Sequence, residues 1–302
     1  MRLPLRTAYE SRATSKRDAW PSASNRRAVP LSRIQRDILL LLAANRTPDS
    51  YVAGSAPLNR DAPRQSADID IFQDREERVA RAASEDAQLL ADHGYVLAWL
   101  RRDPSIYSLS AEREGASTKL EWVADSDFRF FPTLPDDLFG YVLHPADLAT
   151  NKVAAAYGRR EPRDLVDLLT INDEILPLGA TILASAGKAL GFTPEGIINE
   201  IRRIANYREE DFRRIDSDPP VDPAQTMRRF RKMLDEAADF VAQMPTDTVG
   251  VLFLKDGKPV QPDPARLGQY QTHSDSRRGH WPTNADIAGA MLRRVLEGEQ
   301  GS

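Results

Sequence analysis

The stretch 51–72 reads YVAGSAPLNRDAPRQSADIDIF, and the order of its residues decides the fold. A short apolar strand ends in Gly54-Ser55, and after a polar loop an alternating strand carries Asp68 and Asp70. Because side chains alternate across a strand, the two aspartates share one face and lie about 7 Å apart along it. Two carboxylates so placed can converge on a divalent cation, of the kind that binds phosphate oxygens during in-line transfer.

The Gly54-Ser55 pair suits the close approach of a phosphate. A glycine lets the backbone come near a ligand, and a serine hydroxyl can donate a hydrogen bond to a phosphate oxygen. Taken singly, an Asp-x-Asp pair is often an exposed strand face, and a Gly-Ser pair is often only a turn. Together and in this order they are what nucleotidyl transfer requires, and the pattern resembles the nucleotidyltransferase superfamily. The loop between them, with Asn59 and Arg64, is well placed to meet a substrate.

Length and composition bound the class of protein. The chain has 302 residues, of which 41% are hydrophobic and 28% charged, enough for a folded core of one or two domains. The apolar runs are too short to span a bilayer, and the N-terminus lacks the apolar core of a signal peptide. Without cysteine there are no disulfides and no thiolate metal sites. These properties favour a cytoplasmic protein.

The charge distribution is uneven along the chain. A net charge of −4 does not by itself indicate a nucleic-acid-binding protein, but residues 1–46 contain ten basic and three acidic side chains. Residues 1–30 show no hydrophobic periodicity and are expected to form a flexible basic arm. Such an arm either contacts phosphates or is a solvated tail.

Hydrophobic periodicity predicts an α+β fold, with a mixed sheet and flanking helices followed by a mainly helical C-terminal domain. In the first part, 31–143, the predicted helices are 31–45 and 75–93, and the predicted strands are 51–53, 67–72, 95–100, 106–111 and 118–123. In the second part, 144–300, the predicted helices are 146–157, 162–171, 174–189, 194–205, 223–243 and 284–297. Asp256-Gly257 predicts a hairpin near 249–260, and 262–282 reads as an exposed loop or linker.

A second informative stretch, 143–169, reads LHPADLATNKVAAAYGRREPRDLVDLL. Its first helix carries Lys152 among small apolar residues, so this lysine either extends to solvent or points into a site. Its second helix carries Asp164 and Asp167, which are neighbours because they lie three residues apart. An acidic side chain near a helix start is ordinarily a partner of the helix dipole, which explains Asp164 taken alone.

Four motifs together resemble one family. Gly-Ser, Asp-x-Asp, a helical lysine and the pattern Arg-x-x-x-Arg-Asp-x-x-Asp-Leu at 159–168 look like the AbiEii/AbiGii-type nucleotidyltransferase toxins of bacterial abortive-infection and toxin–antitoxin pairs. The resemblance covers roughly residues 30–172. It implies a nucleotidyltransferase core with a helical C-terminal domain, transfer of a nucleoside monophosphate from an NTP with Mg²⁺, and an antitoxin partner. Characterised relatives attach nucleotides to the 3′ end of tRNA.

The resemblance also implies roles for individual residues. By matching position, the triphosphate would be held by Gly54 and Ser55, and the metal by Asp68 and Asp70. Within the second stretch, the implied site residues are Lys152 for phosphate charge, Arg163 for the nucleotide and Asp164 as the polar residue of the last motif.

This chain departs from the superfamily pattern in one place, the residue that would supply a third metal-binding carboxylate. A further strand often supplies an aspartate, whereas the corresponding strand here offers Glu121 in KLEWV. The longer side chain would bind a metal weakly, through water, or act as a base; the alternative is a half-exposed strand glutamate. Asp125 and Asp127, just past the strand, are weaker candidates.

Other functions remain open at this level. The alternatives to an RNA-modifying toxin are nucleotidylation of a small molecule or a protein, and a catalytically silent binding protein with the same fold. An aminoglycoside pocket should be acidic, whereas the C-terminal half carries many arginines, which favour a phosphate-rich acceptor. Amphipathic helices display arginines routinely, so this preference is modest. The intact Gly-Ser, Asp-x-Asp and lysine motifs favour an enzyme over a silent protein.

Overall fold

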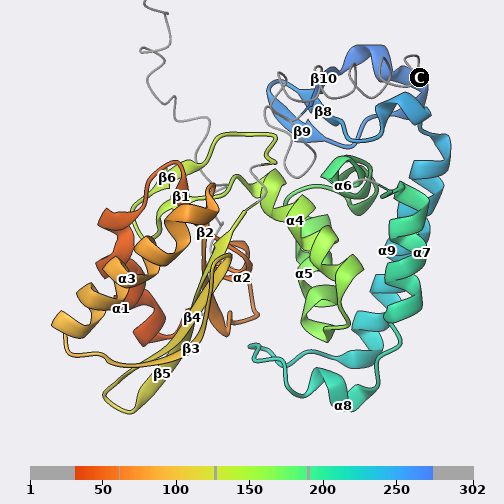
Figure 1. Ribbon diagram of the computed structural model, residues 1–302. Helices are drawn as coiled ribbons and strands as arrows, with labels where there is room; N and C mark the ends of the chain where they lie inside the picture. Colours follow the sequence, from red (N-terminus) through yellow and green to blue (C-terminus); the bar gives the residue numbers. More distant parts are fainter. Residues whose placement is uncertain (1–30, 61, 126–127, 189–190, 275–302) are drawn as a thin grey trace, which may run out of the picture.

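A computed structural model describes residues 31–60, 62–125, 128–188 and 191–274 (Figure 1). The expected basic arm at 1–30, the candidate Asp127 and the expected helix at 284–297 lie outside these residues. Within them, no helix is both long enough and apolar enough to cross a lipid bilayer.

The first part of the chain is organised around a seven-stranded mixed sheet in the order β3-β4-β5-β2-β1-β7-β6. Strand β1 pairs antiparallel with β2 and parallel with β7, and β2 pairs parallel with β5. The strands are β1 Ser50–Ala53, β2 Asp68–Gln73, β3 Val96–Asp103, β4 Ile106–Arg113, β5 Ala116–Ala124, β6 Leu134–Asp136 and β7 Gly140–Val142. The expected strands are confirmed, while β6 and β7 were not predicted because three residues are too few to show a period.

Helices α1 (Arg33–Leu42) and α3 (Glu76–Asp92) cover one face of this sheet (Figure 1). Ser32 caps the start of helix α1: its hydroxyl accepts a hydrogen bond from the Gln35 backbone N–H, and the Gln35 side chain accepts one from the Ser32 N–H. Ile69 and Ile71 of β2 are buried under these helices. The alternate residues of β2, including both aspartates, therefore face the other side of the sheet, toward the C-terminal helices.

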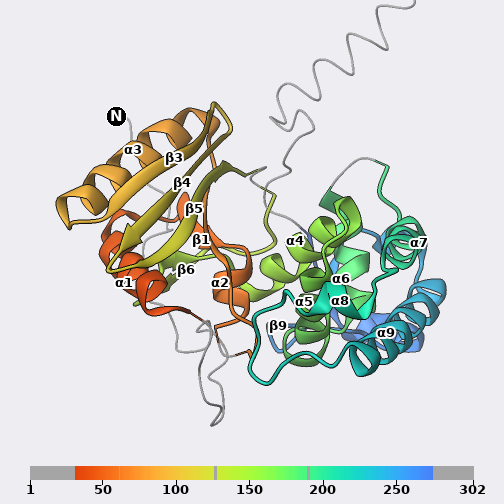
Figure 2. The same ribbon diagram turned by 90° about the horizontal axis from the view of Figure 1, so that it is seen from below.

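The second part of the chain is mainly helical, as predicted, and has its own hydrophobic cluster (Figure 2). Its helices are α4 Pro145–Gly158, α5 Pro162–Glu174, α6 Leu178–Ser185, α7 Pro194–Ile204, α8 Glu209–Phe212 and α9 Pro223–Gln243. The predicted helix at 174–189 is wrong at its start, because α5 runs to Glu174 and α6 begins only at Leu178. Pro177 is the reason, since proline disfavours a helical conformation in the residue before it.

A small three-stranded sheet in the order β10-β8-β9 lies at the end of the described chain. The hairpin of β8 (Leu252–Lys255) and β9 (Lys258–Val260) confirms the Asp256-Gly257 prediction, with φ of 52° and 73° at these two residues, as a type I′ turn requires. The segment expected as loop or linker, 262–282, is not all loop. It contains a 3₁₀ helix and β10 (Gln271–His273), which pairs with β8.

Candidate active site

Gly54 ends β1 and begins the short helix α2 (Ser55–Leu58) in a conformation that only glycine adopts easily, with φ of 72°. A Cβ atom at this position would lie 2.0 Å from Oδ2 of Asp70. The absence of a side chain thus lets the Asp70 carboxylate rest against the backbone where the Gly-Ser turn begins. The backbone of the Gly-Ser turn therefore packs directly against β2, the strand that carries both aspartates.

We expect Gly54→Ala to lower both stability and activity, because the added methyl group collides with Asp70 and strains the backbone. Gly115→Ala is the matched control, since Gly115 also has positive φ, of 78°, but its Cβ would meet no atom within 4 Å. The control isolates the strain, which costs about 1 to 2 kcal/mol. Urea unfolding of both variants, with activity assays, measures the difference. Equal destabilisation by the two substitutions would show that contact with Asp70 contributes nothing.

A cavity of about 230 Å³ lies where β2 and β5 face α4 and α5. It brings together most of the residues that the sequence motifs indicate: Gly54, Ser55, Asp68, Asp70, Glu121, Lys152 and Arg163. The parallel register of β2 and β5 places Glu121 directly beside Asp70 on the same face of the sheet. Glycine, serine, lysine and three carboxylates thus line one cavity, although they come from distant parts of the sequence.

The three carboxylates of this cavity differ in their partners. Asp68 lies 3.9 Å from the Arg163 guanidinium, and Glu121 forms an ion pair of 2.6 Å with Lys119. Asp70 forms no hydrogen bond or ion pair with any residue that the structure describes. Desolvation in the cavity, reinforced by Glu121 and Asp68 and opposed by Lys152, raises the pKa of Asp70 to about 6. Asp70 is therefore an anionic group without a direct ion-pair partner among the described residues, although Lys152 and Arg163 act on it from a distance.

The donor set suits a hard divalent cation. Carboxylate oxygens are the ligands that Mg²⁺ prefers, and Mg²⁺ usually takes only one or two carboxylates, the rest of its shell being water and substrate phosphates. In the described part of the chain, no three acidic or histidine side chains already converge as a metal cage. The unpartnered Asp70, with Asp68 and Glu121 on either side, fits the two-carboxylate mode.

Asp167 of α5 is the centre of a buried polar network behind the cavity. Its carboxylate accepts hydrogen bonds from Arg64 at 2.8 and 3.0 Å and from Asn59 at 3.0 Å. The Lys152 ammonium lies 2.7 Å from the same carboxylate. Burial alone would raise the pKa of Asp167, but Lys152 and Arg64 hold it well below its usual value.

The network fixes a hydroxyl and an ammonium group that line the cavity. Lys152 Nζ donates to Ser55 Oγ at 2.7 Å, and Ser55 Oγ in turn lies 3.4 Å from Asp167. Only 7% of the Lys152 side chain is exposed, so this lysine points into the site and does not extend to solvent. A hydroxyl and an ammonium group are therefore held side by side at the Gly-Ser turn.

Asp164, the implied polar residue of the last motif, is buried in α5. Its carboxylate forms two hydrogen bonds with Arg159, at 2.8 and 2.9 Å, and it is 3.9 Å from Lys152 without lining the cavity. Asp167, three residues later, makes the direct contacts with Lys152 and Ser55. The sequence signal for Asp167 is its place beside the buried stripe of Leu165 and Leu168, where an aspartate needs a partner.

The polar loop before β2 contributes two side chains to this buried network. Asn59 and Arg64 are buried, and both turn inward to Asp167. Asp125, the weaker metal candidate, accepts a hydrogen bond from Tyr51 and does not line the cavity.

Comparisons with known proteins bear on the fold. No protein-family model matches the chain, and no curated protein matches its sequence. Among solved structures, the chain is similar to MenT4, a nucleotidyltransferase toxin from Mycobacterium tuberculosis H37Rv, with 16% identity and a TM-score of 0.52 over 71% of this chain and 84% of that one. A cytoplasmic RNA terminal U-transferase, at 14% identity, a TM-score of 0.24 and 51% and 39% coverage, is too distant to add to this. The chain has a nucleotidyltransferase-like fold.

Proposed function

We propose that this protein is a nucleotidyltransferase that moves a nucleoside monophosphate from an NTP to an RNA acceptor. The observation that carries the proposal is the meeting of Gly54-Ser55, Asp68, Asp70 and Lys152 in one cavity. The fold shared with a nucleotidyltransferase toxin supports it. Along the chain, we propose that the catalytic core spans 31–143 and the helical domain 144–300.

In this proposal the chain positions the triphosphate and the charges around it. The Gly54-Ser55 turn and the Lys152 ammonium bind the phosphates that leave, while Asp167 holds Lys152 in place. A ribose hydroxyl of the acceptor attacks the α-phosphorus, a new P–O bond forms, and the bond to pyrophosphate breaks as the hydroxyl proton passes to solvent. Mg²⁺ bound by Asp68 and Asp70, with Glu121 beside them, would supply charge neutralisation at the reacting phosphate.

We further infer that the acceptor is the 3′ end of tRNA and that the activity inhibits growth until an antitoxin opposes it. The support is the motif resemblance to AbiEii/AbiGii-type toxins together with the fold of MenT4. Incubation with each labelled NTP, Mg²⁺ and total tRNA tests this directly, with sequencing of the extended 3′ ends. Label recovered on cellular protein or on an aminoglycoside, and not on RNA, would contradict the proposed acceptor.

Lys152→Ala is expected to lower the rate of transfer by about a hundredfold or more, the scale of losing one charged stabilising group. Lys119→Ala is the matched control, because Lys119 is more exposed and is paired with Glu121 at 2.6 Å. Lys152→Arg should restore only part of the rate, since a planar guanidinium does not replace a compact ammonium. Initial rates of labelled NTP incorporation compare the three variants. Equal losses for the two alanine variants would show that Lys152 has no specific role in transfer.

A further inference from the structure

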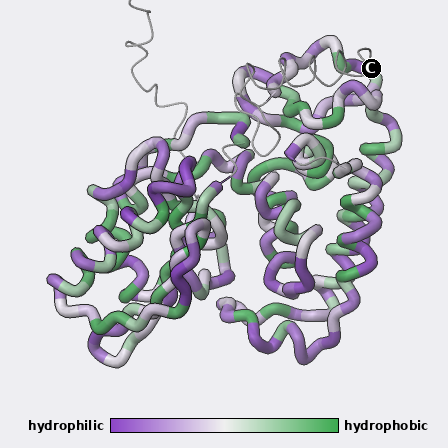
Figure 3. Tube along the Cα trace, viewed as in Figure 1, coloured by the Kyte–Doolittle hydropathy of each residue, from purple (hydrophilic) through white to green (hydrophobic). Residues whose placement is uncertain are grey.

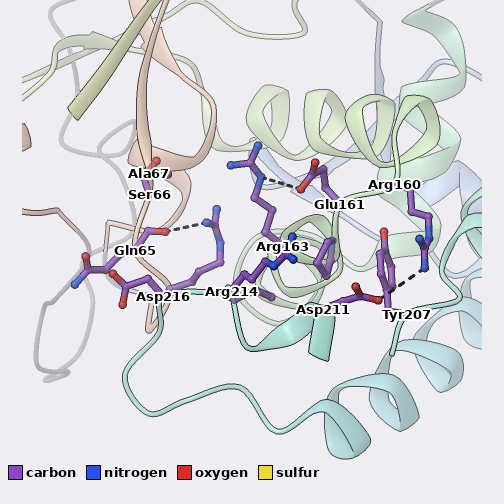
Figure 4. A pocket seen from close by; sticks show the side chains of 13 residues that line it. Gln65, Ser66, Ala67, Arg160, Glu161, Arg163, Tyr207, Asp211, Arg214 and Asp216 are labelled. Atoms are coloured by element: carbon purple, nitrogen blue, oxygen red, sulfur yellow. Dashed lines mark hydrogen bonds and ion pairs between the residues drawn. The ribbon is translucent and has the colours of Figure 1, made fainter. Parts of the chain in front are cut away.

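A second cavity, of about 380 Å³, opens beside the candidate active site. Ser66, Ala67 and Arg163 line both cavities, so the two are neighbours. Figure 4 shows Gln65, Ser66 and Ala67 on one side of the second cavity, Arg160 and Tyr207 on the other, and Arg163 between them. A molecule in the second cavity would therefore reach the carboxylate face of β2.

One wall of this cavity is formed by residues 214–216, and this segment is hydrogen-bonded to the loop before β2. The Gln65 N–H donates to the Asp216 carbonyl at 2.9 Å, and the Asp218 N–H donates to the Pro63 carbonyl at 3.1 Å. The chain around α8 that forms this wall is mainly hydrophilic (Figure 3). The walls of the cavity thus come from both parts of the chain and are held together by backbone hydrogen bonds.

The walls combine an aromatic ring with guanidinium groups. The Arg160 guanidinium carbon lies 5.0 Å from the centre of the Tyr207 ring, and Pro162 and Ile215 add apolar surface. Such a surface can take the flat face of a nucleobase. Because every base has such a face, this wall alone indicates a nucleotide without indicating which one.

Two arginines of the cavity have hydrogen-bonding capacity to spare. Arg163 approaches Asp68 and Glu161 only to 3.9 and 3.8 Å, and its Nε atom is buried without a hydrogen-bond partner. Arg214 is exposed and forms no ion pair with any residue in the described part of the chain. Guanidinium groups in this state favour phosphate oxygens as partners.

The position of these arginines indicates whether the second cavity binds the NTP or the end of the RNA acceptor. All the negative charge of an NTP lies on its triphosphate, which the proposed function assigns to Ser55 and Lys152 in the first cavity. The neutral nucleoside of an NTP needs no arginines, whereas a strand carries one phosphate for each nucleotide. Tyr207 and Arg214 line only the second cavity, and Arg163 lies where the two cavities meet. Arginines beside an aromatic ring at this position match the phosphates and bases of the acceptor.

We propose that the second cavity binds the last nucleotides of a single-stranded RNA acceptor, with a base on Tyr207 and phosphates on Arg163 and Arg214. This inference rests on the proposed function. It places the acceptor end next to Asp68, on the β2 face where transfer takes place.

The test measures RNA binding separately from chemistry. The probe is a short single-stranded oligoribonucleotide with a 3′-deoxy end, which lacks the attacking hydroxyl, and binding is followed by fluorescence anisotropy at several salt concentrations. Tyr207→Ala should weaken binding by roughly fivefold or more, the effect of losing one stacked base. Arg214→Ala should weaken binding and reduce the log–log salt slope by about 0.7. The control is Arg228→Ala, an exposed arginine of α9 that lines neither cavity.

Steady-state kinetics with a 3′-hydroxyl RNA complete the test. Both cavity variants should raise the KM for RNA and leave the KM for NTP unchanged. Arg214→Ala should melt close to the wild type, because Arg214 is exposed, whereas Tyr207→Ala should melt lower, because Tyr207 packs against Phe212. A raised KM for NTP alone would make the second cavity the nucleoside site of the NTP and overturn the proposal. Binding equal to that of Arg228→Ala, or no binding of RNA by the wild type, would also overturn it. RNA binding by this cavity without any transfer would instead refute the proposed function.

Discussion

Asp70→Asn is expected to reduce nucleotide transfer by about a thousandfold or more, the upper range for loss of one electrostatic group at a reacting centre. Asparagine has nearly the same shape but cannot supply the negative charge that a cation requires. The fold should persist, because Asp70 makes no hydrogen bond or ion pair with the described residues. Single-turnover transfer of labelled NTP to RNA, with Mg²⁺ at saturation, gives the measurement.

The same substitution is expected to raise the melting temperature when metal is chelated. The pKa of Asp70 is raised to about 6, so its ionised form at neutral pH opposes folding, and a neutral amide removes that cost. Asp103→Asn serves as the control, because Asp103 is half exposed at the end of β3 and, among the described residues, pairs with Arg101 alone. Wild-type transfer by Asp70→Asn would remove its assignment as a metal ligand. A lower melting temperature would mean that Asp70 has a structural role.

Asp167→Asn is expected to destabilise the protein by about 3 to 5 kcal/mol, the usual loss when one partner of a buried ion pair is removed. The substitution removes the carboxylate that pairs with Arg64, leaves Lys152 only the more distant Asp164 at 3.9 Å among the described residues, and turns an amide N–H₂ toward donors. Activity should fall as well, since Lys152 and Ser55 lose the group that holds them. Urea unfolding followed by circular dichroism measures the free energy of unfolding.

Asp173→Asn, on the same helix, is the matched control for Asp167. Asp173 is half exposed and pairs with Arg229 at 2.5 Å at the surface, so its loss should cost about 0 to 1 kcal/mol. Because the folded-state pKa of Asp167 is lowered, its stabilising effect should be complete above about pH 4 and disappear as the pH falls further. An unfolding midpoint of Asp167→Asn equal to that of the wild type would show that the network adds no stability.

Local patterns were enough to predict the part of the site that lies on the sheet. The alternation of Asp68, Ile69 and Asp70 fixed which side chains share a face, and the buried Ile69 confirms it. The role of Gly54 could be predicted from its place at a strand end alone, since the positive φ there is a property of the turn itself. The Ser32 cap and the Asp256-Gly257 turn are local in the same sense, because each depends on residues a few positions away.

The network behind the site could not be predicted in this way. The partners of Asp167 come from the loop before β2 and from α4, and only the packing of these segments brings them together. The sequence places Asp164 and Asp167 on one helix without choosing between them. The choice depends on Arg159, which precedes the helix and donates two hydrogen bonds to the Asp164 carboxylate. Short elements such as α8 show too few residues for a hydrophobic period to appear.

The Asp167 network has a consequence for when the activity begins during synthesis of the chain. The three carboxylates of the cavity are all present once the ribosome has synthesised β5. Lys152 and Asp167 follow later in the chain, in α4 and α5. A nascent chain that ends before α5 carries the carboxylates but cannot hold Lys152 against Ser55. We expect the emerging polypeptide to stay inactive until α5 has left the ribosome.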